Sequence, residues 1–427
     1  MLTRLDLRGS SADLRTALAA PASDDDPRRL ATVQEIIAAV RARGDRALRE
    51  LTARFDGCDI ADVRVSEAEC EAALGGIDSD LRAALEHARA AITAYHQEQR
   101  TPGTAIERAG VYSREVVVPV DRAGLYVPGG RAAYPSTVLM TAIPARIAGV
   151  PAIALCVPPG QDGKVPAATL AAAALVGVDE VYRVGGAQAI AALAYGTETI
   201  VPVDVIFGPG NAYVALAKRK VAGVVGTDTA GPSEVAVVAD DTADPRFAAA
   251  DLLAQTEHGP DGAAVLVTWS EPVADAVDRE LDALVAGAAG SPDLRATLAS
   301  TGRAILVDGP DHAMAIANAL APEHLELLVA DPDKLVTLVR NAGAVFCGPW
   351  APAVVGDYLA GVNHVLPTGR TARFASALRV SDFERRIHVV TLDKEALLGL
   401  EPDIRALARV EGLDAHAAAV AERRTQS

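Results

Sequence analysis

Residues Glu180–Ile190 have the sequence EVYRVGGAQAI, and this stretch decides the class of fold. Its first five residues, Glu180–Val184, form a short apolar segment typical of a buried strand, and Gly185 and Gly186 follow at once. The Ala-rich segment after the glycines predicts a helix. A strand, a glycine turn and a helix in that order favour an α/β fold. Such a turn can also bind a phosphate at the helix N-terminus.

The same alternation continues on both sides of this stretch. Further short apolar segments predict strands, and helix-like segments such as 167–176 and 246–256 follow most of them. The predicted strands are Glu115–Val118, Ala152–Val157, Val203–Phe207, Val235–Ala239, Ala263–Thr268, Ala304–Val307 and Ala344–Cys347. Alternating strands and helices predict mostly parallel sheets, and these strands suffice for two of them. We therefore expect an α/β fold with two Rossmann-like, parallel-sheet halves.

The two ends of the chain have different patterns. Residues 28–100 carry apolar side chains at helical spacing and predict an N-terminal helical region. From about Ser381 a β-like stretch, His388–Leu392, precedes a charged helical segment with little core of its own. A C-terminal tail of this kind is typical of a segment that packs on another surface, such as a partner subunit.

Composition limits the classes of function. The 427 residues suit two or three domains, and half of them are hydrophobic, which allows a sizeable core. The formal charge of −16 argues against nucleic acid or an anionic membrane as the main partner. No signal-peptide pattern, no segment of roughly 18 apolar residues and no CxxC pair are present. We therefore expect a cytoplasmic protein with free thiols.

Two histidine segments could carry chemistry. Gln255 and His258 lie three residues apart at the end of a predicted helix, where they could bind one metal ion or cap the helix. Glu323 and His324 could serve as general base and water activator, or lie in a surface turn marked by Pro322. Neither segment decides between its two interpretations alone.

Two more segments are equally ambiguous. Asp357 and His364 lie in a stretch rich in Gly, Asp, Asn and Pro, which is typical of a loop that lines a site or of an Asx-type turn. Glu411 and His416 lie in the tail, where a solvated helix face is the simpler interpretation.

Glycine-rich turns follow three strand-like segments. They are Gly129-Gly130 after Tyr126, Gly185-Gly186 before Gln188, and Gly208–Asn211. None has the GxGxxG spacing of the usual dinucleotide fingerprint. Phosphate binding and ordinary turns between strand and helix fit them equally well.

Taken together and in order, these segments resemble the histidinol dehydrogenase family over nearly the whole chain. The matching stretches include YVPGG at 126–130, YPSTVLM at 134–140, AGPSE at 230–234, DLLAQTEH at 251–258 and APEHL at 321–325, with others at 185–190, 207–211, 356–368 and 411–416. The resemblance implies the architecture shared by aldehyde and histidinol dehydrogenases. It also implies NAD-dependent oxidation of L-histidinol to L-histidine via L-histidinal, the last steps of histidine biosynthesis.

The resemblance implies a role for each candidate. Gln255, His258, Asp357 and His416 would bind one zinc ion, and the amine and imidazole of the substrate would complete its shell. His324 would be the general base, and Glu323 would activate water. The side chains that would line the substrate site are Ser233, His364 and Glu411, and those that would contact NAD are Tyr126, Gln188 and Asn211.

The resemblance also implies a division of the chain. Residues 1–25 would be an N-terminal arm, and residues 26–120 would join 233–378 in a metal-binding catalytic domain. Residues 121–232 would bind NAD. The tail, 379–427, would reach the neighbouring subunit of a homodimer, so that the metal site is shared between chains.

Some positions depart from the family, and other functions compete. The departures, none of which removes a proposed ligand, are Val205 for a Lys, Thr227 and Thr229 for apolar residues, Gly259 for an acidic residue and Val362 for a Pro. The rival functions are a related NAD-dependent dehydrogenase of another hydroxy compound, such as a hydroxylated sulfonate, a zinc hydrolase that uses Glu323, and a metal-binding protein without catalysis. The related dehydrogenase would lack residues that recognise an imidazole and an amine. The hydrolase would form no NADH, and the non-catalytic protein would leave the Glu323–His324 pair without a role.

Overall fold

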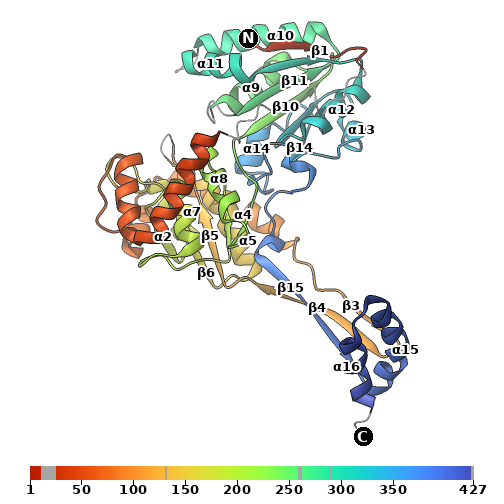
Figure 1. Ribbon diagram of the computed structural model, residues 1–427. Helices are drawn as coiled ribbons and strands as arrows, with labels where there is room; N and C mark the ends of the chain where they lie inside the picture. Colours follow the sequence, from red (N-terminus) through yellow and green to blue (C-terminus); the bar gives the residue numbers. More distant parts are fainter. Residues whose placement is uncertain (11–25, 130–131, 258–261, 288–290, 425–427) are drawn as a thin grey trace.

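The structure, a computed structural model, describes residues 1–10, 26–129, 132–257, 262–287 and 291–424. This part of the chain forms two α/β units and a projecting C-terminal tail (Figure 1). Each α/β unit is built on a six-stranded sheet, and the tail carries part of a three-stranded sheet. The expected fold of two parallel-sheet halves with an N-terminal helical region is confirmed.

The two six-stranded sheets, here sheet I and sheet II, have corresponding strand orders. Sheet I runs β2-β7-β6-β5-β8-β9, and sheet II runs β1-β12-β11-β10-β13-β14. All pairs except β2 with β7 are parallel, so each sheet has the Rossmann-like order 3-2-1-4-5 plus one edge strand. The strands of sheet I are β2 (Arg64–Val65), β5 (Arg122–Tyr126), β6 (Ala152–Cys156), β7 (Glu180–Tyr182), β8 (Val205–Phe207) and β9 (Gly226–Thr227). Those of sheet II are β1 (Thr3–Asp6), β10 (Glu234–Ala239), β11 (Ala263–Thr268), β12 (Arg303–Leu306), β13 (His324–Leu328) and β14 (Ala344–Cys347).

Helices cover both sheets, so the central strands are almost wholly apolar and buried. Ile153, Ala154 and Leu155 of β6, for example, are inaccessible to solvent. The helices that follow the strands of sheet I are α5 (Pro135–Ala148), α6 (Ala167–Leu175), α7 (Gly186–Tyr195) and α8 (Ala212–Val221). Those that follow the strands of sheet II are α9 (Pro245–Thr256), α10 (Glu271–Gly287), α11 (Ser291–Thr301), α12 (Pro310–Leu320), α13 (Pro332–Val336) and α14 (Ala353–Tyr358).

The N-terminal helices pack on the unit of sheet I, whereas residues 26–120 were expected to group with 233–378. They are α2 (Pro27–Phe55), α3 (Glu67–Gly76) and α4 (Ser79–Gln97), and they pack on α7, α6 and α5 respectively. The apolar face of α2, with Val33, Val40 and Leu48, shares one core with Ile190 and Leu193 of α7. Burial of that face holds the helices on sheet I.

The first residues of the chain are also placed differently from expectation. Residues 3–6 of the supposed arm form β1, the edge strand of sheet II, paired in parallel with β12. Leu2 and Leu7 are buried, and Asp278 binds both the N-terminal ammonium group and the Leu2 N–H. Residues 11–25 lie outside the described part.

The sequence analysis missed two central strands. β5 contains Arg122 and Gly124, which weaken the strand pattern, and β13 contains two titratable side chains, His324 and Glu326. All five residues of β13 are nevertheless buried. Glu323-His324 is therefore the start of a core strand, not a surface turn.

The tail is held by a long antiparallel pair of strands. β15 (Glu384–Leu392) pairs over nine residues with β4 (Val111–Pro119), and β3 (Ala105–Arg108) adds a third strand. The helices α15 (Lys394–Glu411) and α16 (Asp414–Arg424) lie at the far end, away from both α/β units (Figure 1). This tail consists of the expected C-terminal segment together with β3 and β4, which precede β5 in the sequence.

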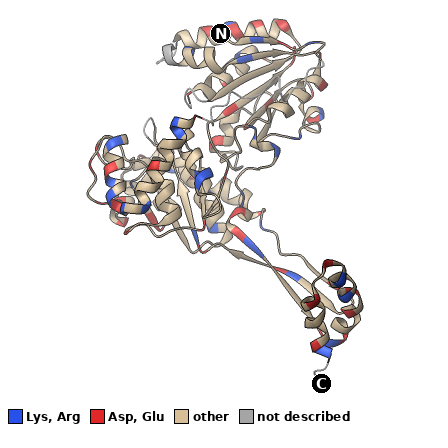
Figure 2. Cartoon of the chain, in the orientation of Figure 1, with Lys and Arg blue, Asp and Glu red and all other residues tan. Residues whose placement is uncertain are grey.

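Charged residues of both signs are interspersed along the outer helices and the tail (Figure 2). Among the described residues, no helix has the length and apolar character needed to cross a membrane.

The junction of β5 and β8 requires glycine at position 208. Gly208 has φ +125°, and a Cβ there would lie 2.0 Å from the carbonyl oxygen of Tyr126. Gly177 also has positive φ, +67°, but a Cβ there would meet nothing within 4 Å. We expect Gly177→Ala to cost about 1 kcal/mol of stability. Gly208→Ala should cost about 2–6 kcal/mol, because overpacking adds to backbone strain. Chemical unfolding of both variants measures the difference, and equal losses would contradict this account of the junction.

Candidate active site

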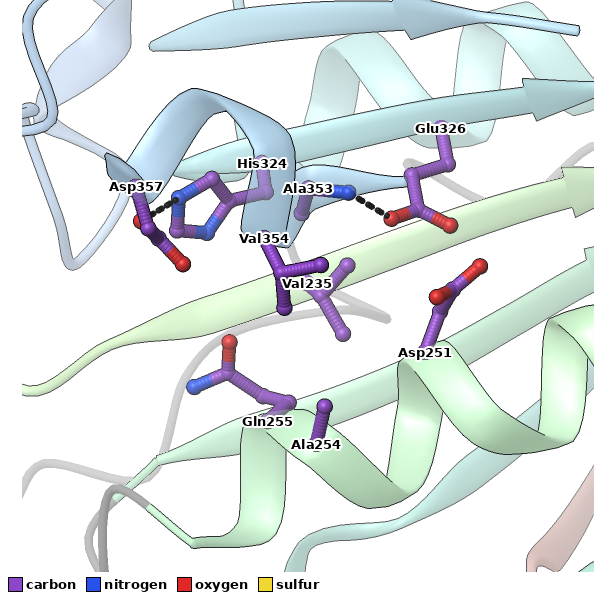
Figure 3. A pocket seen from close by; sticks show the side chains of 9 residues that line it. All are labelled: Val235, Asp251, Ala254, Gln255, His324, Glu326, Ala353, Val354 and Asp357. Carbon is purple, nitrogen blue, oxygen red and sulfur yellow. Dashed lines mark hydrogen bonds and ion pairs between the residues drawn. The ribbon is translucent and has the colours of Figure 1, made fainter. Parts of the chain in front are cut away.

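The candidate site lies at the edge where the strands of sheet II begin. Glu323 and His324 stand at the start of β13, and Ser233 directly precedes β10. Gln255 comes from the last turn of α9 and Asp357 from α14, which both return to this edge (Figure 3). Ligands of open α/β sheets usually bind where strands end. Sheet II departs from that rule.

Glu323 is a buried acid held by two donors. Its Oε2 accepts hydrogen bonds from the Ser233 hydroxyl and, at 2.9 Å, from the Glu234 N–H. Burial raises the pKa of Glu323 to about 8, the two donors oppose this rise, and the nearby charge of Asp357 adds to it. The carboxyl group can therefore exchange a proton close to neutral pH.

His324 is buried beside Glu323 with its two ring nitrogens in different surroundings. Nδ1 lies 3.3 Å from the Glu234 carbonyl oxygen and 3.6 Å from Glu323 Oε2. Nε2 lies 3.8 Å from Asp357 Oδ1. Burial lowers the pKa of His324, against the opposing effects of Asp357 and the Glu234 carbonyl. We assign the proton of the neutral ring to Nδ1, since a carbonyl oxygen must accept there, and this leaves Nε2 free to take a proton.

A small pocket opens beside His324 (Figure 3). Its lining combines apolar side chains with polar ones from α9, β13 and α14. The lining residues are Val235, Asp251, Ala254, Gln255, His324, Glu326, Ala353, Val354 and Asp357. Gln255 is 6% exposed, and its Nε2 has no hydrogen-bond partner among the described residues. An unpaired buried amide beside a carboxylate and an imidazole fits a polar ligand or a divalent ion.

The structure brings only two of the four expected metal ligands to this pocket. They are Gln255 and Asp357, while His258 lies outside the described residues. His416 is exposed on α16, and Glu411 is exposed at the end of α15, both on the projecting tail. Within the described part, no group of three His, Cys, Asp or Glu side chains could hold a metal ion. One copy of the described chain therefore does not assemble the expected ligand set.

The expected NAD contacts gather where the strands of sheet I end. Tyr126 ends β5, Gln188 lies in the first turn of α7, and Asn211 caps α8. The Tyr126 hydroxyl accepts the Gly186 N–H at 3.1 Å, and Asn211 Oδ1 accepts the N–H groups of two residues of α8. Tyr126 and Gln188 are almost fully buried, so in this structure they shape the two turns.

A buried ion pair holds the Gly208 turn, and the sequence analysis missed it. Lys218 Nζ donates to the Gly208 carbonyl oxygen and lies 2.6 Å from Asp228 Oδ1. Asp228 Oδ2 accepts the Gly208 N–H at 2.6 Å. Lys218 is 1% exposed, and buried lysines need such partners. In the sequence, only the position of Lys218 on the inner face of α8 could have indicated this ion pair.

His364 joins the two sheets. Its Nε2 lies 3.1 Å from the hydroxyl of Thr137, on α5 of sheet I, and its Nδ1 lies 2.9 Å from the Asp357 carbonyl oxygen. The preceding residue, Asn363, donates both to His96 Nε2 and to the Met140 carbonyl oxygen. His96 is fully buried. It helps to fix the loop that carries His364.

The positions that depart from the family lie around these loops. Val205 is buried in β8, Thr227 lies in β9, and the hydroxyl of Thr229 is 2.9 Å from that of Thr371. Val362 adjoins the Asn363 loop, and Gly259 lies outside the described residues.

The fold and the site define an α/β enzyme of two Rossmann-like units, with a buried acid–base pair at the edge by which one unit faces the other. A family model described as histidinol dehydrogenase matches residues 20–424. The chain belongs to the histidinol dehydrogenase family, whose members are oxidoreductases.

Individual relatives agree with the family match. The chain is 50% identical to a histidinol dehydrogenase of Rhizobium meliloti over 397 residues, which are 92% of this chain and 91% of that protein. It is 48% identical to that of Thermobifida fusca over 99% of this chain and 98% of the relative. A crystal structure of histidinol dehydrogenase from Elizabethkingia anophelis superimposes with a TM-score of 0.93 at 34% identity, and the match covers 99% of this chain and 98% of that one.

The buried ion pair of Lys218 gives a testable expectation. Lys218→Met leaves the Asp228 carboxylate without its cation, so we expect a loss of about 3–5 kcal/mol of stability. Lys220→Met, at an exposed position of the same helix, should change stability by less than about 0.5 kcal/mol. Urea unfolding measures both, and Lys218→Met combined with Asp228→Asn should recover part of the loss. Equal effects of the two lysine variants would show that the pair does not hold the turn.

Proposed function

We propose that the protein oxidises L-histidinol to L-histidine through L-histidinal, with two NAD reduced per substrate. The observation that carries the proposal is the buried Glu323–His324 pair, which faces Gln255 and Asp357 across one pocket. Family membership supports the substrate. The two steps require a group that takes a proton from the alcohol and a group that activates water.

His324 is the base for the first oxidation. Its Nε2 is directed toward Asp357 and the pocket, and with the proton on Nδ1 it accepts the proton of the substrate hydroxyl. The carbinol carbon loses a hydride at the same time, and the product is the aldehyde. NAD, when bound, accepts this hydride.

Glu323 serves the second oxidation. The aldehyde must add water before a second hydride can leave, and Glu323 takes a proton from that water. The Ser233 hydroxyl and the Glu234 N–H hold the carboxyl group in place during this exchange. His324 gives its first proton to the carbonyl oxygen as water adds, and it is then neutral again. It takes the proton of one hydroxyl of the hydrated aldehyde as the second hydride leaves, and the resulting carboxylic acid ionises to the carboxylate.

A zinc ion would be held by Gln255, His258, Asp357 and His416 of the partner subunit. Two nitrogen and two oxygen donors suit zinc. When bound, the ion orients the amine and imidazole of the substrate. Ser233, His364 and Glu411 of the partner subunit would line the rest of the substrate site.

We place NAD at the ends of the strands of sheet I. Tyr126, Gln188 and Asn211 lie on three neighbouring turns there, and the N-termini of α7 and α8 suit an anionic cofactor. A Cβ at Gly185 would lie 2.4 Å from Pro158, which shows how closely the turn before α7 packs. The oxygen of Asn211 is already used as a helix cap, so its amide nitrogen is the group left for the cofactor.

The incomplete ligand set of one described chain supports a homodimer with exchanged tails. The tail exposes large apolar side chains, including Leu407 at 65% and Val410 at 88%, and α14 exposes Val354 and Val355 beside the pocket. Apolar surfaces of this kind mark contact sites between proteins. The four cysteines are free, in agreement with our placement of the enzyme in the cytoplasm.

The reaction itself is tested by counting NADH. Zinc-loaded protein should form about two NADH per L-histidinol consumed, with histidine as product, and should lose activity when zinc is chelated. Glu323→Gln should lower the rate about 10²- to 10⁴-fold. Its zinc content and unfolding midpoint serve as controls. A folded, zinc-replete wild-type dimer that forms no NADH from histidinol would overturn the substrate assignment.

Tail exchange is tested with hybrid dimers. His416→Ala and Glu323→Gln each inactivate every site of their own homodimer. A hybrid isolated through two different affinity tags should regain about half of the wild-type activity, because one of its two sites combines an intact pocket with an intact tail. A hybrid as inactive as both parents would show that each tail serves its own chain.

A further inference from the structure

Glu326 is a buried carboxyl group to which the proposed reaction assigns no role. It lies two residues after His324 on β13, so both side chains point to the same side of sheet II. That side faces the pocket, α9 and α14 (Figure 3). Glu326 is 1% exposed, and a group so deeply buried needs partners for its oxygens.

The two oxygens of Glu326 meet two different helices. Oε1 accepts the N–H of Ala353, the first residue of α14, at 2.7 Å. Among the described residues, no N–H or O–H group donates a hydrogen bond to Oε2. The carboxyl group of Asp251, on α9, faces Glu326 within hydrogen-bonding reach (Figure 3).

Two carboxyl groups in contact cannot both be ionised in such a site. Burial raises the pKa of Glu326, and the facing Asp251 raises it further. Burial also raises the pKa of Asp251, but the hydrogen bond with Glu326 favours its ionised form. Glu326 is therefore the protonated partner, and its Oε2 donates the shared proton to the Asp251 carboxylate, which gives Oε2 the partner it otherwise lacks.

The positions of these contacts connect the pair to the pocket. Asp251 lies one helical turn before Gln255 on α9, and Ala353 lies one turn before Asp357 on α14. Glu326, on the strand that begins with His324, thus contacts both helices that carry Gln255 and Asp357.

We propose that Glu326 and Asp251 share one proton and act as positioning residues, holding α9 and α14 at the separation that metal binding by Gln255 and Asp357 requires. The metal-binding part rests on the proposed function, whereas the shared proton does not. The two parts therefore have separate tests.

The shared proton is tested in metal-free protein. A carboxyl group with a raised pKa in the folded chain stabilises least at high pH, because the unfolded chain releases its proton more readily. The ratio of the folding constants of Glu326→Gln and wild type should therefore grow at least about tenfold between about pH 5 and about pH 8. Both tryptophans, Trp269 and Trp350, lie in the unit of sheet II, so their fluorescence follows unfolding of this unit.

The design includes controls for other titrations. His324 and Asp357 also line the pocket, but they are unchanged in these variants, so their effects cancel in the ratio. Asp241→Asn, at an exposed carboxyl group, should give no such trend. Asp251→Asn should give a weaker trend in the same direction, because burial still raises the pKa of Glu326 without the repulsion, and the double variant should match Glu326→Gln, which already removes the shared proton. Additive effects, or no trend, would overturn the shared proton.

The positioning role is tested by zinc titration of the full-length protein. Glu326→Gln keeps an acceptor for Ala353 and a donor for Asp251, so its zinc affinity should stay within about threefold of wild type. Glu326→Leu keeps neither and should bind zinc about 10–100-fold more weakly. Equal affinities of wild type and the Leu variant would overturn positioning, and an equal loss in both variants would make Glu326 a ligand instead. A wild-type protein that binds no zinc would overturn the proposed metal site, and the positioning role with it, while the stability measurement still decides on the shared proton.

Discussion

The two hydrogen bonds of His364 connect the unit of sheet I to the helix that carries Asp357 at the candidate site. One nitrogen is bound to Asp357 on the side of sheet II, and the other contacts Thr137 at the start of α5. The end of sheet I thereby meets the beginning of sheet II. A cofactor at the first edge and a substrate at the second edge would then face each other, although each sheet alone offers only half of such a site.

Most of the fold could be predicted from the sequence, because buried parallel strands are short apolar segments. The prediction failed where polar residues enter the core. β13 was missed because His324 and Glu326 interrupt its apolar pattern, and β5 because Arg122 and Gly124 do. In β13 the interruption includes His324, which we propose as the catalytic base, and functional sites are where local rules are expected to fail.

The sequence predicts a set of candidate residues, but it does not predict how they assemble. Sequence spacing cannot show that Gln255 and Asp357 meet at one pocket, since they lie on helices from different parts of the chain. Nor could it show that Lys218 and His96 are buried with specific partners, or that Asp251 faces Glu326. Those contacts depend on tertiary packing, and they hold the turns, loops and helices on which the candidate residues lie.

The nine-residue pairing of β4 with β15 limits which insertions and deletions this part of the chain can accept during evolution. The pair extends about 30 Å, at roughly 3.3 Å per residue, and carries the tail helices as a stiff rod. A single inserted or deleted residue in either strand would turn every following side chain to the opposite face. Length changes in this rod are therefore tolerable only in matched steps of two, while the loops of the α/β units can drift in length more freely.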